Sequence, residues 1–228
     1  MPLSAQRRKL LQRVANLVPA AAGEDCVRVA VDGVDGSGKT IFADELAATL
    51  TARGRPVVRI SADDFLNPRV VRHRRGRHSP EGFWLDSYDY AKLTEYVLGP
   101  LSPGGDRCYR RAAHDLASDT HVQPLLETAQ AGSVLVIDGL FLHRDGLAEL
   151  WDCSVFLDVP FEVTAARMSA RDGSHPDPSH PSMARYVQGQ LLYLAACDPA
   201  SRATVTIDNT DPDHPVMSPD QGVPPVAR

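Results

Sequence analysis

The sequence has few cysteines and no long apolar run, and both absences exclude classes of protein. Its four cysteines lie far apart and form no Cys-x-x-Cys pair: Cys26, Cys108, Cys153 and Cys197. This spacing favours neither a disulfide framework nor a zinc site. No window approaches the roughly 18 consecutive apolar residues of a membrane-spanning helix, and no apolar secretion segment follows the basic residues near the start. We therefore expect reduced thiols in a soluble, cytoplasmic protein without a membrane partner.

A surplus of positive charge is also lacking. The formal net charge is −5, so the overall charge gives no general attraction to nucleic acid, and a nucleic-acid partner is not expected on this ground. Hydrophobic residues make up 43% and charged residues 23% of the chain, a balance typical of globular proteins. The 228 residues suit one sizeable domain. The sequence is compatible with a homo-oligomer.

Short apolar runs alternate with helical patterns along the chain. The expected strands are 27–32, 57–61, 133–138, 153–159 and 203–208, and the expected helices are 3–18, 39–52, 89–98, 161–171 and 183–196. Such alternation indicates a mostly parallel sheet covered by helices on both faces. We therefore expect an α/β fold of three layers around a five-stranded, mostly parallel sheet.

Three segments interrupt this alternation. Residues 99–132 combine Pro, Gly and weak alternation, which predicts a small inserted hairpin of the kind that often carries substrate specificity. Residues 172–182 are rich in Pro, His and Ser, which indicates a mobile loop. Residues 209–228 hold five prolines and little apolar content, so we expect a single domain over 1–208 followed by a poorly ordered tail.

The stretch GVDGSGKT, residues 33–40, follows an apolar strand and precedes a helical pattern. It matches G-x-x-x-x-G-K-[ST] in the context that this phosphate-binding motif, the P-loop, requires. Its glycines let backbone N–H groups converge on phosphate oxygens at a helix N-terminus. Lys39 is expected to bridge the β- and γ-phosphates of ATP, and the Thr40 hydroxyl to hold Mg²⁺. The candidate nucleotide-binding residues are Gly33, Asp35, Gly36, Ser37, Gly38, Lys39 and Thr40.

An acceptor-side motif follows the second expected strand. Ala62-Asp63-Asp64-Phe65 comes directly after strand 57–61, and in a parallel sheet the carboxyl end of a strand beside the P-loop strand faces the same crevice. Asp63 can take the proton from an acceptor hydroxyl or orient it for in-line attack. An Asp here can equally cap a helix or an Asx turn. No Asn-Lys-x-Asp sequence occurs, which argues against a GTPase, so the pattern favours a kinase with Asp63 as catalytic base.

The order of these motifs resembles that of the uridine kinase family of P-loop kinases, whose relatives include phosphoribulokinase and pantothenate kinase. The resemblance covers about residues 26–208, and the P-loop and the Asp63-Asp64-Phe65 element are its most specific parts. It implies a P-loop NTPase-type fold and an ATP- and Mg²⁺-dependent kinase that phosphorylates a hydroxyl of a uridine- or cytidine-like nucleoside. It also implies that Asp63 lies near the metal and Asp64 beside the acceptor.

The resemblance further assigns a third metal-site residue. Asp138 ends the strand at 133–138 and corresponds to an acidic residue that the family places near Mg²⁺, so the expected metal set is Thr40, Asp63 and Asp138. Family members commonly carry Glu at this point, and the shorter Asp reaches less far. The alternative is an Asp that caps the following turn.

A helical lid over about residues 167–185 is implied in the same way. Arg167 and Arg171 lie one turn apart on a helix, and in the family such arginines close over ATP and neutralise charge on the transferred group, as catalytic residues beside Lys39 and Asp63. The alternative is a surface helix whose arginines pair with nearby carboxylates. The end of the last strand, residues 207–210, is expected near the adenine.

The expected acceptor pocket departs from the family pattern. Residues 86–89 match the second half of the family's nucleoside-gripping element, but residues 83–85 replace its first Asp and its His-Pro. Aromatic side chains there can stack on a ring, or they can belong to the core. The candidate substrate residues are Asp64, Phe83, Tyr88, Tyr109, His114 and Gln190, the last of which lies on the helix after the lid.

A basic run directly follows the candidate catalytic base. Arginines and histidines occupy seven of the ten positions in 69–78. Such a run is usually a solvated face, but an acceptor that already carries negative charge, or RNA, would also suit it. Its position after the acceptor strand favours the charged acceptor over RNA.

Two other functions compete with the nucleoside kinase. A nucleoside monophosphate kinase of the thymidylate kinase type would share the P-loop, but its usual Asp-Arg element after the third strand is missing here. A nucleotide-gated RNA-binding protein would bind ATP without phosphorylating an acceptor, and its affinity for RNA would fall steeply with salt.

Overall fold

The computed structural model describes residues 3–218 and is built on a six-stranded sheet with the strand order β10-β9-β8-β1-β7-β2. The parallel strands are β1 (Val27–Gly33), β2 (Val57–Ser61), β7 (Val134–Asp138), β8 (Cys153–Asp158) and β9 (Val205–Asp208). The edge strand β10 (Val216–Met217) runs antiparallel to β9. The expected α/β class with a mostly parallel sheet is confirmed, with one additional strand.

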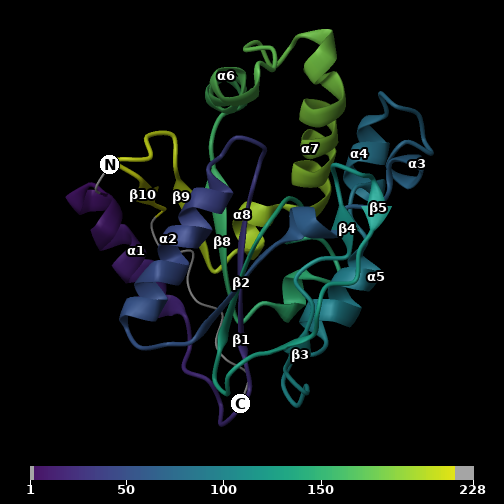
Figure 1. Cartoon of the computed structure of the whole chain (residues 1–228). Coiled ribbons are helices and arrows are strands. Elements are labelled where there is room, and N and C mark those ends of the chain that lie inside the picture. Colours follow the sequence, from purple (N-terminus) through teal and green to yellow (C-terminus); the bar gives the residue numbers. More distant parts are fainter. Residues whose placement is uncertain (1–2, 219–228) are drawn as a thin grey trace.

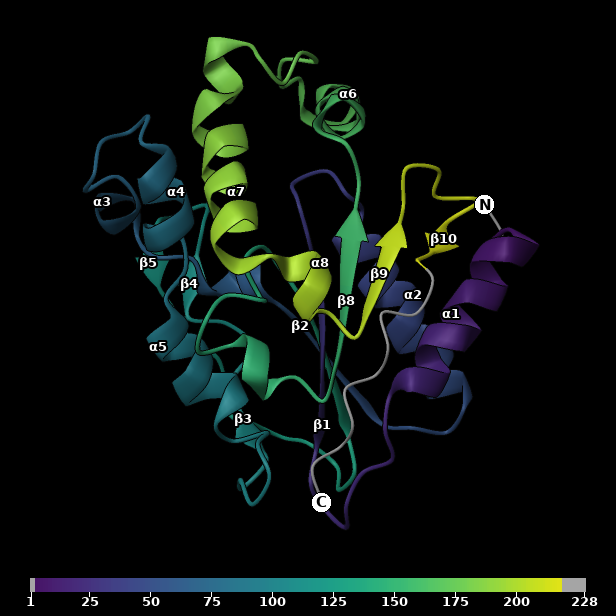
Figure 2. The ribbon, with the colours of Figure 1, turned by 180° about the vertical axis from the view of Figure 1, so that it is seen from behind.

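Helices cover both faces of the sheet (Figure 1 and, from behind, Figure 2). One face is covered by α1 (Ala5–Leu17) and α2 (Lys39–Ala52), and the other by α4 (Pro80–Asp86), α5 (Tyr90–Leu93) and α7 (Ala184–Cys197). The apolar residues of β7 alternate between the two cores: Val134 and Val136 join the first, Leu135 and Ile137 the second. This period of two explains why the strand reads as a continuous apolar run.

Several shorter elements complete the described chain. The helices are α3 (Arg69–Arg72), α6 (Phe161–Asp172) and α8 (Pro199–Arg202), with 3₁₀ turns at Ala62–Phe65, Ala148–Leu150 and Pro181–Met183 and a π-helical turn at Thr94–Leu98. Within residues 3–218, no helix has the length and apolar character needed to cross a membrane.

The inserted segment before β7 holds two short ladders where the sequence predicts one hairpin. β3 (Cys108–Tyr109) pairs with β6 (Glu127–Thr128), and β4 (His114–Asp115) pairs with β5 (Thr120–His121), both antiparallel. The backbone N–H of Ala113 donates to the carbonyl of Asp64 at 2.9 Å. The insertion is therefore fastened to the loop that carries Asp63.

The helix α4 was not expected from the sequence, where its residues suggest only a substrate pocket. Its start is an ordinary one: the Ser79 hydroxyl accepts from the N–H of Gly82 at 3.0 Å, and Pro80 occupies the first turn. α4 packs closely on α7, where a Cβ at Gly189 would lie 2.6 Å from the Pro80 carbonyl oxygen. Only glycine allows this approach between the two helices.

The predicted poorly ordered tail is wrong for residues 209–218. Asn209 is fully buried, and its side-chain amide donates to the Ser37 carbonyl at 2.7 Å and accepts from the Arg7 guanidinium at 3.1 Å. Low apolar content is misleading here, because a buried polar side chain is held by hydrogen bonds rather than by apolar packing. The remainder of that prediction, 219–228, lies outside the described residues.

Replacing Asn209 with Ala is expected to destabilise the protein by about 1–3 kcal/mol, because the Ser37 carbonyl and one Arg7 N–H lose a buried partner. The melting temperature should fall by roughly 2–4 °C for each kcal/mol. Calorimetry measures this directly. The matched control is Asn16→Ala, since Asn16 is exposed on α1 and its side-chain oxygen accepts from Arg53 at 2.8 Å; an equal loss in both variants would contradict the assigned role of Asn209.

Candidate active site

The carboxyl ends of β1, β7 and β2 lie side by side at one edge of the sheet. Val31 of β1 and Ser61 of β2 both pair with Asp138, the last residue of β7. Beyond this row β1 enters the P-loop and β2 enters the 3₁₀ turn that carries Asp63. The register therefore brings the phosphate-binding loop and the candidate base to the same edge, as expected for parallel strands.

Lys39 and Asp63 line one cavity of about 360 Å³ at this edge. The other lining residues are Asp35, Gly36, Gly38, Thr40, Ile41, Asp138, Gly139, Leu140 and Arg171. The structure thus gathers most of the predicted nucleotide and metal residues, together with the predicted base, around a single space. We call this space the transfer cavity.

The P-loop has the backbone conformation that its glycines permit. Gly36 and Gly38 have φ angles of +75° and +92°, and a Cβ at Gly36 would lie 2.7 Å from the carbonyl oxygen of Thr164. Helix α2 begins at Lys39, so its N-terminal dipole points at the cavity. The Lys39 ammonium donates to the Val34 carbonyl at 2.9 Å. A side chain at Gly36 would therefore collide with α6, and one at Gly38 would lie 2.9 Å from the Asn209 side chain.

Asp138 is buried between a hydroxyl and a cation. The Thr40 hydroxyl donates to one carboxylate oxygen at 2.7 Å, and the Arg59 guanidinium lies 2.7 Å from the other. Arg59 also pairs with Asp44 at 2.8 Å. The two predicted metal ligands Thr40 and Asp138 are therefore adjacent. Arg59 was not predicted, although its place as the only charged residue in an apolar strand is a readable signal.

Asp63 is exposed to the transfer cavity, and a hydrogen bond from the buried Tyr88 orients its carboxylate. The Tyr88 hydroxyl donates to the Asp63 carboxylate at 2.8 Å, and only 4% of Tyr88 is exposed. Burial and the negative charges of Asp63 and Asp35 raise the pKa of Tyr88 well above its usual value. The hydroxyl therefore stays protonated and remains a donor. The structure gives Tyr88 the position of an orienting residue rather than of a platform for a substrate ring.

Replacing Tyr88 with Phe is expected to lower kcat about tenfold, because the lost bond to a charged group is worth roughly 1.5–3 kcal/mol. Acceptor KM and ATP affinity should change little, since Tyr88 acts through Asp63. Steady-state kinetics separates the two parameters. Tyr96→Phe, a half-buried tyrosine beside Lys92, is the control, and a change in KM alone in Tyr88→Phe would contradict the orienting role.

Two further carboxylates lie close to Asp63: Asp35 lines the transfer cavity, and Asp64 follows Asp63 in the sequence. Burial raises the pKa of Asp35, with Lys39 opposing this shift and Asp63 adding to it. Restricted hydration and the charges of Asp63 and Asp138 raise the pKa of Asp64, with Arg59 opposing. Loss of hydration is the largest cause of both shifts, and repulsion from the neighbouring acids adds to it. A divalent cation in the cavity would relieve that repulsion.

The two predicted lid arginines, Arg167 and Arg171, have different hydrogen-bond partners. Arg167 donates to the carbonyls of Asn209 and Thr210, both at 2.9 Å, and to that of Gly36 at 3.3 Å. It lines a second cavity of about 280 Å³, which shares Gly36, Gly38, Ile41 and Arg171 with the transfer cavity. Arg171 lines both and pairs with Asp172 at 2.8 Å. Of the two, Arg171 alone belongs to the described lining of the transfer cavity, while Arg167 contacts the P-loop through the Gly36 carbonyl.

Three predicted substrate residues lie in or under the core instead. Phe83 packs between Phe141 and Tyr186, with ring centroids 5.6 Å and 5.1 Å away. Tyr109 is buried and donates to Glu127 at 3.1 Å, and the buried His114 lies 3.3 Å from Asp119. Among the described residues that line the transfer cavity, none of the three occurs. Aromatic spacing alone does not distinguish a stacking surface from core, and here the core interpretation fits.

Gln190 contacts the P-loop from α7. Its side-chain oxygen accepts from the N–H of Asp35 at 2.6 Å, its side-chain nitrogen donates to the Tyr186 carbonyl at 3.0 Å, and only 2% of the residue is exposed. The predicted contact with an acceptor is replaced by a contact that fixes the loop. Gln190 thus couples the position of α7 to the phosphate site.

A buried polar cluster beneath the P-loop was not predicted. Asp32, at the end of β1, accepts from the Tyr193 hydroxyl at 2.5 Å, from His143 Nδ1 at 2.9 Å and from the N–H of Gly33 at 2.7 Å. Burial and the Asp32 carboxylate raise the pKa of Tyr193 far above its usual value. A single Asp within an apolar strand is the signal that could have found it. The cluster ties α7 to the base of the P-loop.

This combination of sheet order, phosphate loop and opposing carboxylate defines a P-loop phosphotransferase. The sequence profile of the Phosphoribulokinase / Uridine kinase family matches residues 28–176, more than half of the chain. The chain belongs to this family of kinases, which phosphorylate a hydroxyl of a small molecule.

Individual relatives agree with this assignment. A uridine kinase from Shewanella sp. (strain W3-18-1) is 28% identical over 163 residues, which cover 65% of this chain and 70% of that protein. A candidate uridine kinase from Bacillus stearothermophilus has a similar fold, with a TM-score of 0.68 at 23% identity over 87% of this chain and 97% of that one. A candidate fructose transport system kinase from Silicibacter sp. TM1040 gives a TM-score of 0.63 at 25% identity over 85% and 94%.

Proposed function

We propose that this protein is an ATP- and Mg²⁺-dependent kinase that uses Asp63 to activate an acceptor hydroxyl for attack on the γ-phosphate. The observation that carries this proposal is that Lys39 and Asp63 line the same cavity, from the segments that follow β1 and β2, two parallel strands with β7 between them. Lys39 would neutralise the transferred phosphate, while Asp63 would accept the hydroxyl proton on the opposite side. In-line transfer needs donor and acceptor to meet in this way.

The residues at the P-loop fit a nucleotide with its metal. The backbone N–H groups at the start of α2 and the Lys39 ammonium supply phosphate donors, and the adjacent oxygens of Thr40 and Asp138 suit a hard cation. Within residues 3–218, no group of three His, Cys, Asp or Glu side chains could hold a metal by itself. Mg²⁺ usually takes many of its ligands from phosphates and water, and when bound it would supply charge neutralisation at the β- and γ-phosphates.

The second cavity suits the base of the nucleotide. It is lined by Ile41, Met168 and Pro212, and by Asn209 at the end of β9. Apolar side chains beside the guanidinium groups of Arg7 and Arg167 suit the flat face of a purine. Arg171 lies between this cavity and the transfer cavity and would lie along the phosphates.

A nucleoside is the first acceptor to test, because the Shewanella relative is named as a uridine kinase. Burial of Phe83, Tyr109 and His114 argues that a base would have to be held by other side chains. A coupled assay of ATP consumption across uridine, cytidine, other ribosides, pantothenate and phosphosugars tests the proposal. Phosphorylation of any of these hydroxyls supports a kinase, whereas ATP binding without acceptor-dependent turnover would contradict it.

A further inference from the structure

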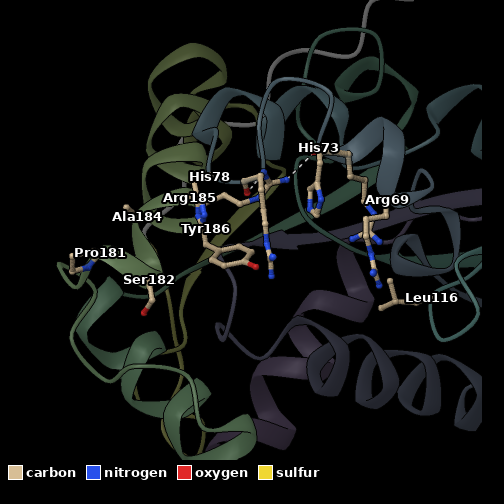
Figure 3. Close-up of a pocket in the computed structure, with 11 residues that line it drawn as sticks. Arg69, His73, His78, Leu116, Pro181, Ser182, Ala184, Arg185 and Tyr186 are labelled. Carbon is tan, nitrogen blue, oxygen red and sulfur yellow. Dashed lines mark hydrogen bonds between the residues drawn. The ribbon is translucent and has the colours of Figure 1, made fainter.

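Three arginines within the described residues are buried: Arg7, Arg28 and Arg185. Arg28 lies 3.5 Å from the carboxylate of Asp152, which balances its charge. Arg185 lines a hollow of about 940 Å³ together with members of the basic run, and Figure 3 shows Arg69 across from it. None of the residues described as lining that hollow lines the transfer cavity or the second cavity. Arg7, in contrast, lines the second cavity beside the P-loop.

Arg7 reaches this cavity from α1, a helix that lies outside the segment 28–176 matched by the family profile. Figure 2 shows the start of α1 beside the segment that joins β9 to β10. Only 3% of Arg7 is exposed, which is rare for a charged side chain on a terminal helix. Because the profile does not include α1, the contacts of Arg7 have to indicate its role.

The Arg7 guanidinium uses two of its three nitrogens to hold the wall of the second cavity. Nε donates to the Glu45 carboxylate of α2 at 2.6 Å. Nη1 donates to the side-chain oxygen of Asn209 at 3.1 Å and to the Pro212 carbonyl at 2.8 Å. Nη2 has no hydrogen-bond partner within residues 3–218. Its N–H groups are therefore available to a ligand that enters the cavity.

The segment after β9 is held from two sides. From α1, the Gln6 amide donates to the Pro215 carbonyl at 3.3 Å, in addition to the contacts of Arg7. From α6, Arg167 donates to the carbonyls at the start of the same segment. Burial lowers the pKa of Arg167, the charge of Asp211 opposes this shift, and the charge of Arg7 adds to it. The two guanidinium groups therefore lie close to each other at one cavity.

The remaining walls of the second cavity suit a flat, apolar group better than a phosphate. Ile41 lines it from the first turn of α2 and is 62% exposed, and Met168 lines it from α6. Guanidinium planes stack on aromatic rings. Arg7 is absent from the described lining of the transfer cavity, where Lys39 lies. A nucleotide with its phosphates on the P-loop would therefore present its nucleoside part to Arg7.

We propose that α1 completes the nucleotide site and that Arg7 binds the nucleoside part of the nucleotide. The planar guanidinium supplies a stacking face, and Nη2 supplies a donor for a base nitrogen or a ribose oxygen. This inference rests on the nucleotide binding in the proposed function, and it adds to that site a residue from outside the matched segment. It does not depend on which acceptor is phosphorylated.

A comparison of two ligands separates the nucleoside from the phosphates. The full chain is titrated calorimetrically with ADP and with inorganic pyrophosphate, each in the presence of Mg²⁺. We expect Arg7→Gln to weaken ADP binding about tenfold or more and to leave pyrophosphate binding within about twofold. Arg8→Gln makes the same charge change at the next position, which is exposed on α1, and should leave both affinities unchanged.

Two results would overturn the inference. Unchanged ADP affinity in Arg7→Gln would show that Arg7 does not contact the nucleotide. An equal loss for ADP and pyrophosphate would assign Arg7 to support of the P-loop, since its partner Asn209 also holds the Ser37 carbonyl.

A second variant keeps the test decisive where Arg7→Gln does not fold. Arg7→Lys retains a positive charge beside Glu45 but removes the planar group and Nη2. We expect the same selective loss of ADP affinity with intact pyrophosphate binding. Wild-type affinity for both ligands in Arg7→Lys would contradict the inference.

A kinase assay distinguishes failure of this inference from failure of the proposed function. If the wild type binds ADP through Arg7 but phosphorylates no acceptor, the kinase proposal fails and the role of Arg7 stands. If an acceptor is phosphorylated while Arg7→Gln keeps full affinity for ADP, the role of Arg7 is wrong and the kinase stands.

Discussion

Replacing Asp63 with Asn is expected to lower kcat by at least about a hundredfold while leaving ATP affinity nearly intact. The amide keeps the size of the side chain and can still meet the Tyr88 hydroxyl, but it cannot accept the proton of an acceptor hydroxyl. ATP affinity should persist because the phosphate donors come from the P-loop and Lys39. Turnover with the best acceptor and calorimetric titration of ATP measure the two quantities separately.

The neighbouring acid provides the matched control for this variant. Asp64→Asn makes the same chemical change one residue away, and Asp64 is absent from the described lining of the transfer cavity. We expect a loss of activity well below that of Asp63→Asn. Unchanged turnover in Asp63→Asn, or an equal loss in both variants, would remove Asp63 from the role of base.

Replacing Lys39 with Met is expected to reduce kcat/KM for ATP by about a thousandfold, since a preorganised cation at a transferred phosphate is worth a hundred- to a thousandfold or more. The change also removes the positive charge that most strongly opposes the raised pKa of Asp35. Among the described residues, the Lys39 ammonium donates a hydrogen bond to the Val34 carbonyl alone, so the fold should tolerate the apolar side chain. Single-turnover kinetics with saturating acceptor measures the loss.

Two comparisons sharpen the lysine experiment. Lys9→Met makes the same change at an exposed position on α1 and should leave kcat/KM as it is. Lys39→Arg retains the charge but not the geometry of an ammonium, so recovery should be partial at best. Activity within a few-fold of wild type in Lys39→Met would show that phosphate is held elsewhere.

The sheet could be predicted because its strands are short, apolar and separated by helical patterns. The residues of β7 alternate between two apolar cores, so the strand is apolar at every position. Such a continuous apolar run is typical of a sheet covered by helices on both faces. Strand ends then followed from the parallel arrangement, which placed Asp63 opposite Lys39. The two-residue strand β10 could not be predicted in the same way, because such a short pair takes its stability from the edge of β9 rather than from its own sequence.

The residues of the candidate site likewise differ in whether the sequence could predict their positions. The backbone conformation of adjacent residues sets the positions of Lys39, Thr40 and Asp63. The local sequence motif therefore predicts them. Phe83 and Gln190 depend on how α4 meets α7, a long-range contact permitted by Gly189. Local pattern contains no information about such a contact, so a ring expected at a ligand lies in the core and a glutamine expected at the acceptor holds the P-loop.

The placement of α7 has a consequence for the whole catalytic cycle. Gln190 accepts from the N–H of Asp35 in the P-loop, and Tyr193 donates to the Asp32 carboxylate beneath that loop. One helix therefore holds the P-loop at two points, so a substitution that displaces α7 would weaken nucleotide binding without touching the nucleotide.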